Sequence, residues 1–376
     1  MRHFKRSVAL FLVTLFLLSV IPVAFANAYN VGDVIEYGSY PQTQITDTVR
    51  IEQFRQDEAN DAAAGNPWAW TSYNYTSGSG QRYDGQMKTG SFMSYHDFTH
   101  GSETYRAVKI TSLRPYYAGY EADNDPIRSY QDDNGFTAGN IYYFHFEPLK
   151  WRVLEPSSGL LISQSIIDAQ PFQSVVYSDG EQYYTSTAKK NLANDYKNSS
   201  LNDWLKRSFF VTAFDRGQQR NIPTALITFA DGSTTSERVF APSLSDVTNR
   251  NYGFGEIGIA DTARKVSGTD YAKCQGLFKT TDNRNSGLAP WWLRDHSADS
   301  GKALCVTYEG KVQNESSTVD LNYVGVRVMC YVNGLVSEDE LCPLCGEKHG
   351  TSFIQRIIAF FHKIFAFIRR TDKNMG

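Results

Sequence analysis

Two adjacent tryptophans constrain the fold of this chain more than any other feature of its sequence. They are Trp291 and Trp292, in the stretch 287–295, which is Gly-Leu-Ala-Pro-Trp-Trp-Leu-Arg-Asp. Because tryptophan is highly buried on average, two neighbouring indoles predict a strand that lines a large core. Pro290 bounds the strand on one side and the polar run 296–301 on the other, which indicates that it opens into a surface loop.

This strand leaves two interpretations open, a structural framework and a ligand site. Alternate side chains of a strand share a face, so Trp291 and Leu293 are expected to point to the core, and Trp292 and Arg294 to lie near the polar side. In the framework interpretation, arginines tie strands together through charge-assisted hydrogen bonds. The framework residues are Trp151, Arg152, Trp204, Trp291 and Arg327. The candidate ligand contacts are Trp292, Arg294, Asp295 and His296.

The first 28 residues have the pattern of a secretory signal peptide. Arg2, Lys5 and Arg6 precede the apolar run 8–20, and small residues suited to signal peptidase follow at 24–28. An apolar run this short, followed by a cleavage site, indicates a signal peptide and not a transmembrane helix. We therefore expect a secreted, extracellular protein.

Residues 29–336 are predicted to form one α+β domain, mainly antiparallel sheet with a few helices, in which about 43–140 form an N-terminal elaboration. The predicted strands are 31–42, 105–110, 140–146, 149–155, 159–163, 238–242, 303–308 and 324–332. A helix is expected at 200–214, because Leu201, Leu205 and Phe209 recur at helical spacing and Ser200 with Asp203 resembles a capping box. A second helix start is expected at Ser243, and 250–287 is expected to be irregular.

The charge of the domain argues against a nucleic-acid partner. The formal charge of the chain is −3, but residues 1–26 contribute +3 and the last 24 residues contribute +4, which leaves about −10 for 27–352. Nucleic-acid binding proteins present basic surfaces instead. The basic C-terminal tail has to be interpreted separately.

Several sequence blocks, in order, resemble an uncharacterised family of secreted proteins from Gram-positive bacteria. The blocks are GSYPQ at 38–42, EPLKWRVL at 147–154, Trp-Leu at 204–205, Val-Phe at 239–240, WWLR at 291–294 and GVR at 325–327. The chain departs from the family pattern at Val328, where proline is usual, and at Ala241 and Pro242. Members of that family carry no assigned activity, so the resemblance implies an extracellular domain of unknown function.

More distantly, a tryptophan strand followed by a terminal Gly-x-Arg strand is similar to C-type-lectin-like folds, which include the formylglycine-generating enzymes. Those enzymes hold copper with a pair of cysteines. Cys274, Cys305 and Cys330 do not map onto such a pair residue by residue. The similarity therefore implies a fold and not an activity.

The segment 337–350 contains the most specific chemical motif in the sequence. Zincin, nucleophile-elbow, P-loop and dinucleotide fingerprints are absent from the sequence. Cys342, Cys345 and His349 provide two thiolates and an imidazole at the spacing of a zinc knuckle. A disulfide or a redox pair is the alternative in a secreted chain. Zinc at these three residues is the one cofactor that the sequence suggests.

The segment 351–370 predicts a basic amphipathic helix. Its apolar and basic residues segregate to two faces, and it is too short and too charged to span a bilayer. The predicted membrane contacts are Phe353, Ile357, Phe361, Ile364, Phe365, Arg356, Lys363, Arg369 and Arg370. Docking on the domain or on a second copy is the alternative.

The leading functional expectation is a surface-associated extracellular recognition module, with a carbohydrate or a peptide as its ligand. Aromatic platforms suit sugar faces, and long polar loops on a rigid sheet suit binding. An enzyme of the formylglycine-generating type, a hydrolase with a dispersed site, and a structural envelope protein are the alternatives. The expected partners are the cell envelope or membrane surface, through the tail, and an extracellular ligand.

Overall fold

The computed structural model describes most of residues 29–335. The exceptions are 74–80, 84–85, 89–92, 112, 114–127, 130, 133, 179–180, 185–192, 230–231, 281–283, 300 and 313–316. Residues Asn30–Leu335 form one compact unit. The predicted signal peptide and the two predicted segments at 337–350 and 351–370 lie outside the described residues.

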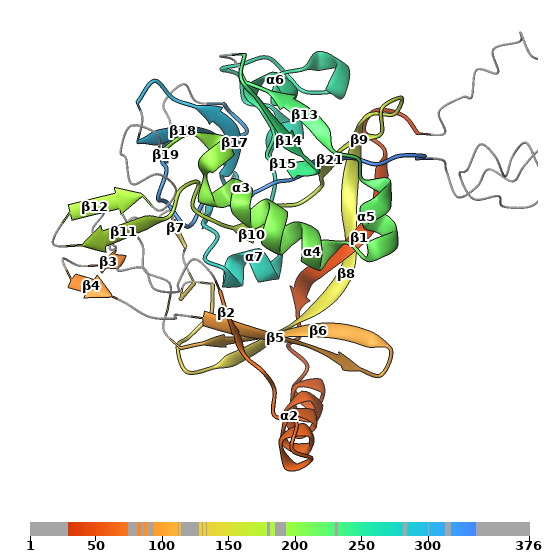
Figure 1. The fold of residues 1–376 in the computed structure, drawn as a ribbon, viewed down its shortest axis with the longest axis vertical. Coiled ribbons are helices and arrows are strands. Elements are labelled where there is room, and N and C mark those ends of the chain that lie inside the picture. Colours follow the sequence, from red (N-terminus) through yellow and green to blue (C-terminus); the bar gives the residue numbers. More distant parts are fainter. Residues whose placement is uncertain are drawn as a thin grey trace, which may run out of the picture. The chain divides into compact units, whose positions relative to one another are not determined.

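The main sheet has eight strands among the described residues, in the order β15-β21-β9-β8-β6-β5-β2, with β1 also paired to β8 (Figure 1). The strands are β1 (Val34–Gln44), β2 (Thr71–Ser72), β5 (Met93–His100), β6 (Glu103–Ile110), β8 (Ile141–Glu155), β9 (Leu160–Ser163), β15 (Val239–Phe240) and β21 (Met329–Tyr331). All of their pairings are antiparallel. The predicted α+β class with a mainly antiparallel sheet is confirmed.

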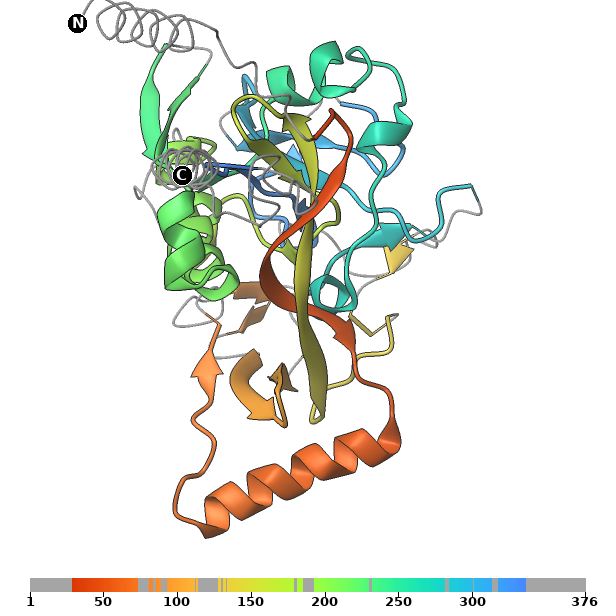
Figure 2. The ribbon, with the colours of Figure 1, turned by 90° about the vertical axis from the view of Figure 1, so that its right-hand side faces the viewer.

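Strand β8 is the longest element of this sheet and joins its two halves. It pairs with β6 near its start, with β9 near its end, and with β1 along its length (Figure 2). The sequence predicted two strands separated by Pro148, which is wrong, because β8 continues through the proline. Proline lacks an amide hydrogen, and the β1–β8 register is irregular on both sides of the Ser39–Pro148 pair.

A second sheet carries the tryptophan strand. Its order is β10 (Asp168–Ala169), β20 (Gly325–Val326), β17 (Trp291–His296), β18 (Lys302–Val306) and β19 (Ser317–Thr318). The β17–β20 pair is parallel, and the other pairs are antiparallel. Two-stranded pairs complete the β structure: β3 (Gln81–Tyr83) with β4 (Gln86–Lys88), β7 (Arg128–Ser129) with β16 (Lys279–Thr280), β11 (Val175–Ser178) with β12 (Glu181–Tyr184), and β13 (Ala225–Thr228) with β14 (Thr234–Glu237).

The first described helix, α2 (Thr48–Ala63), was not predicted. The Asp47 side chain caps it by accepting a hydrogen bond from the Arg50 amide at 2.8 Å. Phe54 is its one fully buried residue and packs on Phe98, Tyr105 and Tyr143 of the sheet, with ring centroids 4.6–5.1 Å apart. A helix that buries so little has almost no apolar stripe, which is why its sequence did not reveal it.

The predicted helix at 200–214 is present, in three consecutive parts. These are α3 (Ser200–Trp204), a π-helical turn (Leu205–Phe209) and α4 (Phe210–Ala213). Leu201, Leu205 and Phe209 are fully buried, as the helical spacing predicted. The cap is Ser199 and not Ser200, because the Ser199 hydroxyl accepts from the Asn202 amide at 3.1 Å.

The remaining helices are short. They are α5 (Arg216–Asn221), α6 (Leu244–Val247) and α7 (Asp270–Cys274), with 3-10 turns at Tyr196–Asn198, Arg250–Tyr252 and Thr262–Arg264. The predicted helix start at Ser243 is confirmed, since Ser243 and Asp246 form a reciprocal capping box. The stretch 250–287 is largely irregular, as expected, but it contains α7, which was not predicted.

Candidate ligand-binding cleft

Trp292, one of the four predicted ligand contacts, is fully buried. Its side chain has 0% exposure, its indole nitrogen donates to the Gln170 carbonyl at 2.8 Å, and its ring packs edge-on to Phe172 at 5.7 Å. The prediction that Trp292 faces the polar side is therefore wrong. The alternation argument assumed one solvated face, whereas both faces of β17 are covered and Trp291 through Arg294 are all buried.

Arg294 is a framework residue and not an open ligand contact. Its Nη1 donates to the Ala241 carbonyl at 2.9 Å and to Asp246 Oδ2 at 2.7 Å, and its guanidinium lies 5.6 Å from the Phe240 ring centroid. These contacts tie β17 to the start of α6 and to β15. Arg294 was predicted to lie near a polar side of the strand. It lies in the interior instead, where a carboxylate and a carbonyl accept hydrogen bonds from its guanidinium.

Asp295 is the predicted ligand residue that lines a hollow of the surface. The hollow has a volume of ≈ 760 Å³. Its lining residues are Thr228, Phe229, Ser243, Leu244, Ser245, Thr248, Glu256, Ile257 and Asp295. We call this hollow the Asp295 cleft. His296 is exposed, at the end of β17, and is not among its lining residues.

Three short segments between residues 228 and 257 build the walls of the Asp295 cleft, together with Asp295 of β17. The end of β13 supplies Thr228 and Phe229, the α6 segment supplies 243–248, and the loop before the Thr262–Arg264 turn supplies Glu256 and Ile257. These are connections between elements, where binding residues often lie. None of them carries a sequence motif.

The α6 wall is held in place by hydrogen bonds among its own polar side chains. The Asp246 amide donates to the Ser243 hydroxyl at 3.0 Å, and that hydroxyl lies 2.8 Å from the Ser245 hydroxyl. The Thr248 hydroxyl donates to the Leu244 carbonyl at 2.8 Å. Hydroxyl groups are therefore presented to the cleft on a short, well-capped helix.

The Asp295 carboxylate is directed by one strong hydrogen bond. Its Oδ2 accepts from the Leu244 amide at 2.6 Å, and among the described residues its Oδ1 has no hydrogen-bond partner. Burial raises the pKa of Asp295, while the Leu244 amide and the charge of Arg294 lower it and Asp246 raises it further. Oδ2 is thus held by the Leu244 amide, and Oδ1 remains available to a ligand in the cleft.

Four of the five predicted framework residues are buried or half-buried and make the following contacts. The Trp151 indole is fully buried and donates to the Tyr37 carbonyl at 2.7 Å, and the Trp291 indole donates to the Arg264 carbonyl at 3.1 Å. Arg152 donates to two carbonyls of the turn at Tyr252 and packs on Phe254. Trp204 is only half-buried and stacks on Phe209.

Arg327, the fifth framework residue, is buried without a carboxylate among the described residues. Its Nε and Nη2 donate to the Ser163 carbonyl at 2.9 and 2.6 Å, and its guanidinium lies 4.9 Å from the Trp291 ring centroid. In the described part of the chain its Nη1 has no hydrogen-bond partner, and burial lowers the pKa of Arg327 to about 9. It links β9 to the segment between β20 and β21, as the framework interpretation expected.

The three cysteines of the described part are free and buried. They lie on separate elements, Cys274 in α7, Cys305 in β18 and Cys330 in β21, and burial raises the pKa of each thiol. A thiol with a raised pKa is a poor nucleophile and metal ligand. Among the same described residues, no three His, Cys, Asp or Glu side chains are grouped so as to hold a metal ion.

The predicted zinc ligands and membrane contacts lie outside the described residues. This applies to Cys342, Cys345 and His349 and to every predicted contact of the segment 351–370. Within the described part of the chain, no helix has the length and apolar character needed to cross a bilayer.

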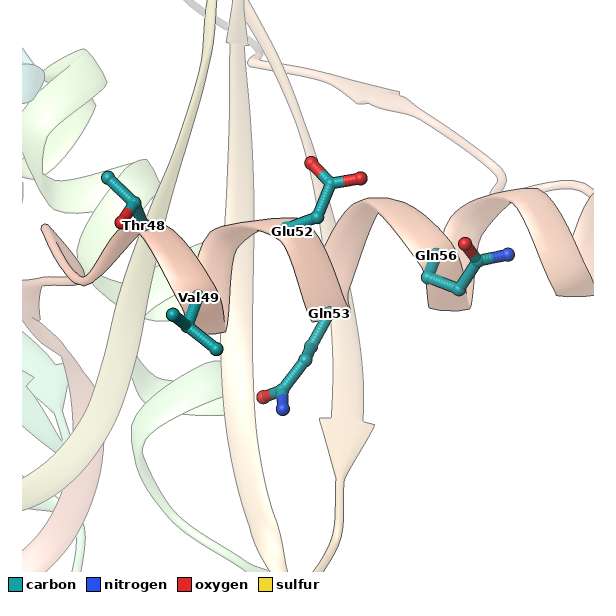
Figure 3. Close-up of a pocket in the computed structure, with 5 residues that line it drawn as sticks. All are labelled: Thr48, Val49, Glu52, Gln53 and Gln56. Carbon is teal, nitrogen blue, oxygen red and sulfur yellow. The ribbon is translucent and has the colours of Figure 1, made fainter.

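A second hollow, of ≈ 480 Å³, follows the outer side of α2. Figure 3 shows that its lining side chains, Thr48, Val49, Glu52, Gln53 and Gln56, all project from that helix. Because one helix supplies the whole lining, no second wall brings chemical groups together across it. The Asp295 cleft, with three converging segments, is the stronger candidate.

Comparison with known proteins identifies one domain within the chain. Residues 157–334 match the family model "Domain of unknown function (DUF6273)". No curated protein and no solved structure matches the chain significantly. The match is consistent with the expected uncharacterised family, and it covers all the residues that line the Asp295 cleft.

Proposed function

We propose that this protein is an extracellular recognition module that binds a carbohydrate in the Asp295 cleft. The observation that carries the proposal is the lining of a ≈ 760 Å³ hollow by hydroxyl groups, a half-buried carboxylate and one aromatic ring. Ligand pockets of a few hundred Å³ with a small number of directed polar groups are typical binding sites. A C-type-lectin-like relationship, suggested by the order of the terminal strands, is part of the same proposal.

The chemistry of the cleft matches a polyhydroxylated ligand. The open oxygen of Asp295 accepts hydrogen bonds, and the hydroxyls of Thr228 and Ser245 both donate and accept. Phe229 is half-buried and provides an apolar surface for a sugar face. A peptide could use the same hydroxyls but would leave the ring without a specific partner, so we favour the carbohydrate.

A glycan array with purified mature protein tests the proposal, followed by Phe229→Ala and Asp295→Asn measured by calorimetry on any glycan that binds. We expect each variant to lower affinity by about tenfold, which corresponds to about 1.4 kcal/mol. Leu226→Ala is the matched control, because Leu226 is an exposed apolar residue of β13 that does not line the cleft. Binding that survives both cleft variants, or no glycan binding by the wild type, contradicts the proposal.

We further propose that the tail associates this module with an anionic membrane surface and that Cys342, Cys345 and His349 hold zinc. The support for both is the sequence pattern alone: a cationic amphipathic segment and a Cys-x-x-Cys pair with a following histidine. Metal analysis of the reduced protein tests the zinc site. A Cys342–Cys345 disulfide without bound zinc contradicts it.

A further inference from the structure

Arg264 lies behind the Asp295 cleft, and its side chain is fully buried. It donates five hydrogen bonds, all of them to backbone carbonyl oxygens. The acceptors are Gly310 at 2.8 Å from Nε, Val247 at 2.9 Å and Gly255 at 2.7 Å from Nη1, and Glu256 at 3.0 Å and Ile259 at 2.6 Å from Nη2. A guanidinium has five N–H donors, so every donor of Arg264 is used.

Four of these acceptors belong to two of the segments that build the cleft, α6 and the loop that contains Glu256. Val247 is the last residue of α6, and Glu256 belongs to the loop that carries Ile257 into the lining. Asp261 completes the attachment, since its Oδ2 accepts from the Gly255 amide at 2.8 Å and lies 3.7 Å from Arg264 Nη1. One side chain therefore joins the α6 wall to the loop wall from behind.

We propose that Arg264 is a positioning residue for the Asp295 cleft. It sets the separation of the two walls before any ligand arrives, so that the ligand meets a preformed site. This inference rests on the proposed carbohydrate-binding function. The physical reason is entropy: a loop that is already fixed does not have to be ordered on binding, and that cost is not subtracted from the affinity.

Lysine cannot replace Arg264 in this role. An ammonium group has three donors on one nitrogen, whereas the five carbonyls surround a planar group with three nitrogens. At least two carbonyls would lose their partner in Arg264→Lys, and the loop would no longer be tied to α6 at all its present points.

The test compares two buried arginines, Arg264→Lys and Arg327→Lys. Arg327 is buried to a similar degree but donates to Ser163 and touches no cleft residue. We expect both variants to melt at lower temperature. Only Arg264→Lys should bind the array-identified glycan about tenfold more weakly and show faster hydrogen exchange at the amides of Gly255 and Asp261. Equal loss of affinity in both variants, or none in Arg264→Lys, overturns the proposal.

Asp261→Ala is the second variant, for use if Arg264→Lys does not fold. It removes the acceptor of the Gly255 amide and the carboxylate beside Arg264, while the five carbonyl acceptors of Arg264 remain, and it should weaken the glycan affinity in the same direction. If the wild type binds no glycan, the proposed function fails separately. The positioning role is then decided by exchange alone, and unchanged exchange of the loop amides in both variants overturns it.

Discussion

Asp320 is a carboxylate that the fold buries without a full set of donors. Its side chain is 3% exposed, its Oδ2 has no hydrogen-bond partner among the described residues, and burial raises its pKa to about 6, against the smaller opposing effect of its bonds to its own amide and to Thr318. The folded state therefore binds this proton more tightly than the unfolded state does. The ionised form is held there at a cost in free energy.

We predict that Asp320→Asn stabilises the protein at pH 8 by up to about 3 kcal/mol and has little effect at pH 4. Because the folded-state pKa of Asp320 is raised, its contribution to the free energy of unfolding is fully present below the unfolded pKa of 3.8. That contribution is lost as the pH rises through about 6. Urea denaturation of both proteins at pH 4, 6 and 8 measures the difference. A difference that does not grow with pH contradicts the prediction.

Single residues also show where prediction from sequence ends. Trp291 was predicted to be a framework residue and Trp292 a ligand contact, but the side that Trp292 faces depends on the cover supplied by Phe172, from a segment far away in the sequence. Arg264 was not predicted at all, because a buried arginine whose partners are backbone carbonyls leaves no pattern in its neighbours. Asp295 was predicted to contact a ligand because it lies where the strand was expected to open into a loop, and in the structure it lines the cleft.

At the scale of elements, the turn between β8 and β9 is fixed by its contact with the end of β21. Gly159 has φ +72°, and a Cβ atom added to it would overlap the Val332 carbonyl oxygen. The same two residues are also hydrogen-bonded, since the Val332 amide donates to the Gly159 carbonyl at 3.0 Å. The turn is thus part of the sheet packing and not a free surface loop.

We predict that Gly159→Ala lowers the free energy of unfolding by about 3 kcal/mol or more, through the left-handed backbone and the overlap together. Gly232→Ala is the matched control, because Gly232 has φ +79° with open space around its Cβ position. The control should lose about 1 kcal/mol. Chemical denaturation of both variants separates the two contributions, and equal losses would show that the Val332 contact is unimportant.

Elements with a regular pattern were predictable, and those defined by tertiary contacts were not. The alternation at 105–110 gave β6, and the spacing of Leu201, Leu205 and Phe209 gave the α3–α4 region. Strand β8 was divided in two because a proline ordinarily ends pairing, yet the bulged register with β1 accommodates Pro148. Helix α2 is polar nearly all round, so only its contact with the sheet through Phe54 defines it.

At the scale of the whole molecule, the main sheet contains strands that precede the matched domain in the sequence as well as strands within it. The family match begins at residue 157, directly after β8 ends at Glu155, but β9 takes its neighbour from β8. Trp151, Val153 and Leu154 of β8 are fully buried in the shared core. The matched segment therefore depends on the strands that precede it.

We predict that residues 157–335 alone do not fold cooperatively, whereas residues 30–335 do. Each fully buried large side chain contributes about 1.5–3 kcal/mol, so loss of the β8 core residues approaches the whole stability of a domain. Near-UV circular dichroism and thermal melts of the two fragments measure this. A sharp melting transition in the shorter fragment would contradict the prediction.

The sequence also predicts which segment of the chain contacts a membrane. The segment 351–370 should bind anionic vesicles, because basic residues near an anionic surface contribute about 1 kcal/mol each. In liposome flotation the mature protein should rise with anionic vesicles, and a chain ending at Gly350 should remain below. Vesicles of neutral lipid serve as the control, and equal flotation of both chains excludes the tail as the membrane contact.

The position of β21 determines when this protein can finish folding as it is made. Strand β21 is nearly the last described element in the sequence, but it is inserted between β15 and β9 in the main sheet. A ribosome releases the chain from its N-terminus, so the facing edges of β9 and β15 have no partner until Met329 has left the exit tunnel. The sheet is therefore completed only once β21 has emerged, and until then those edges need protection from other nascent chains.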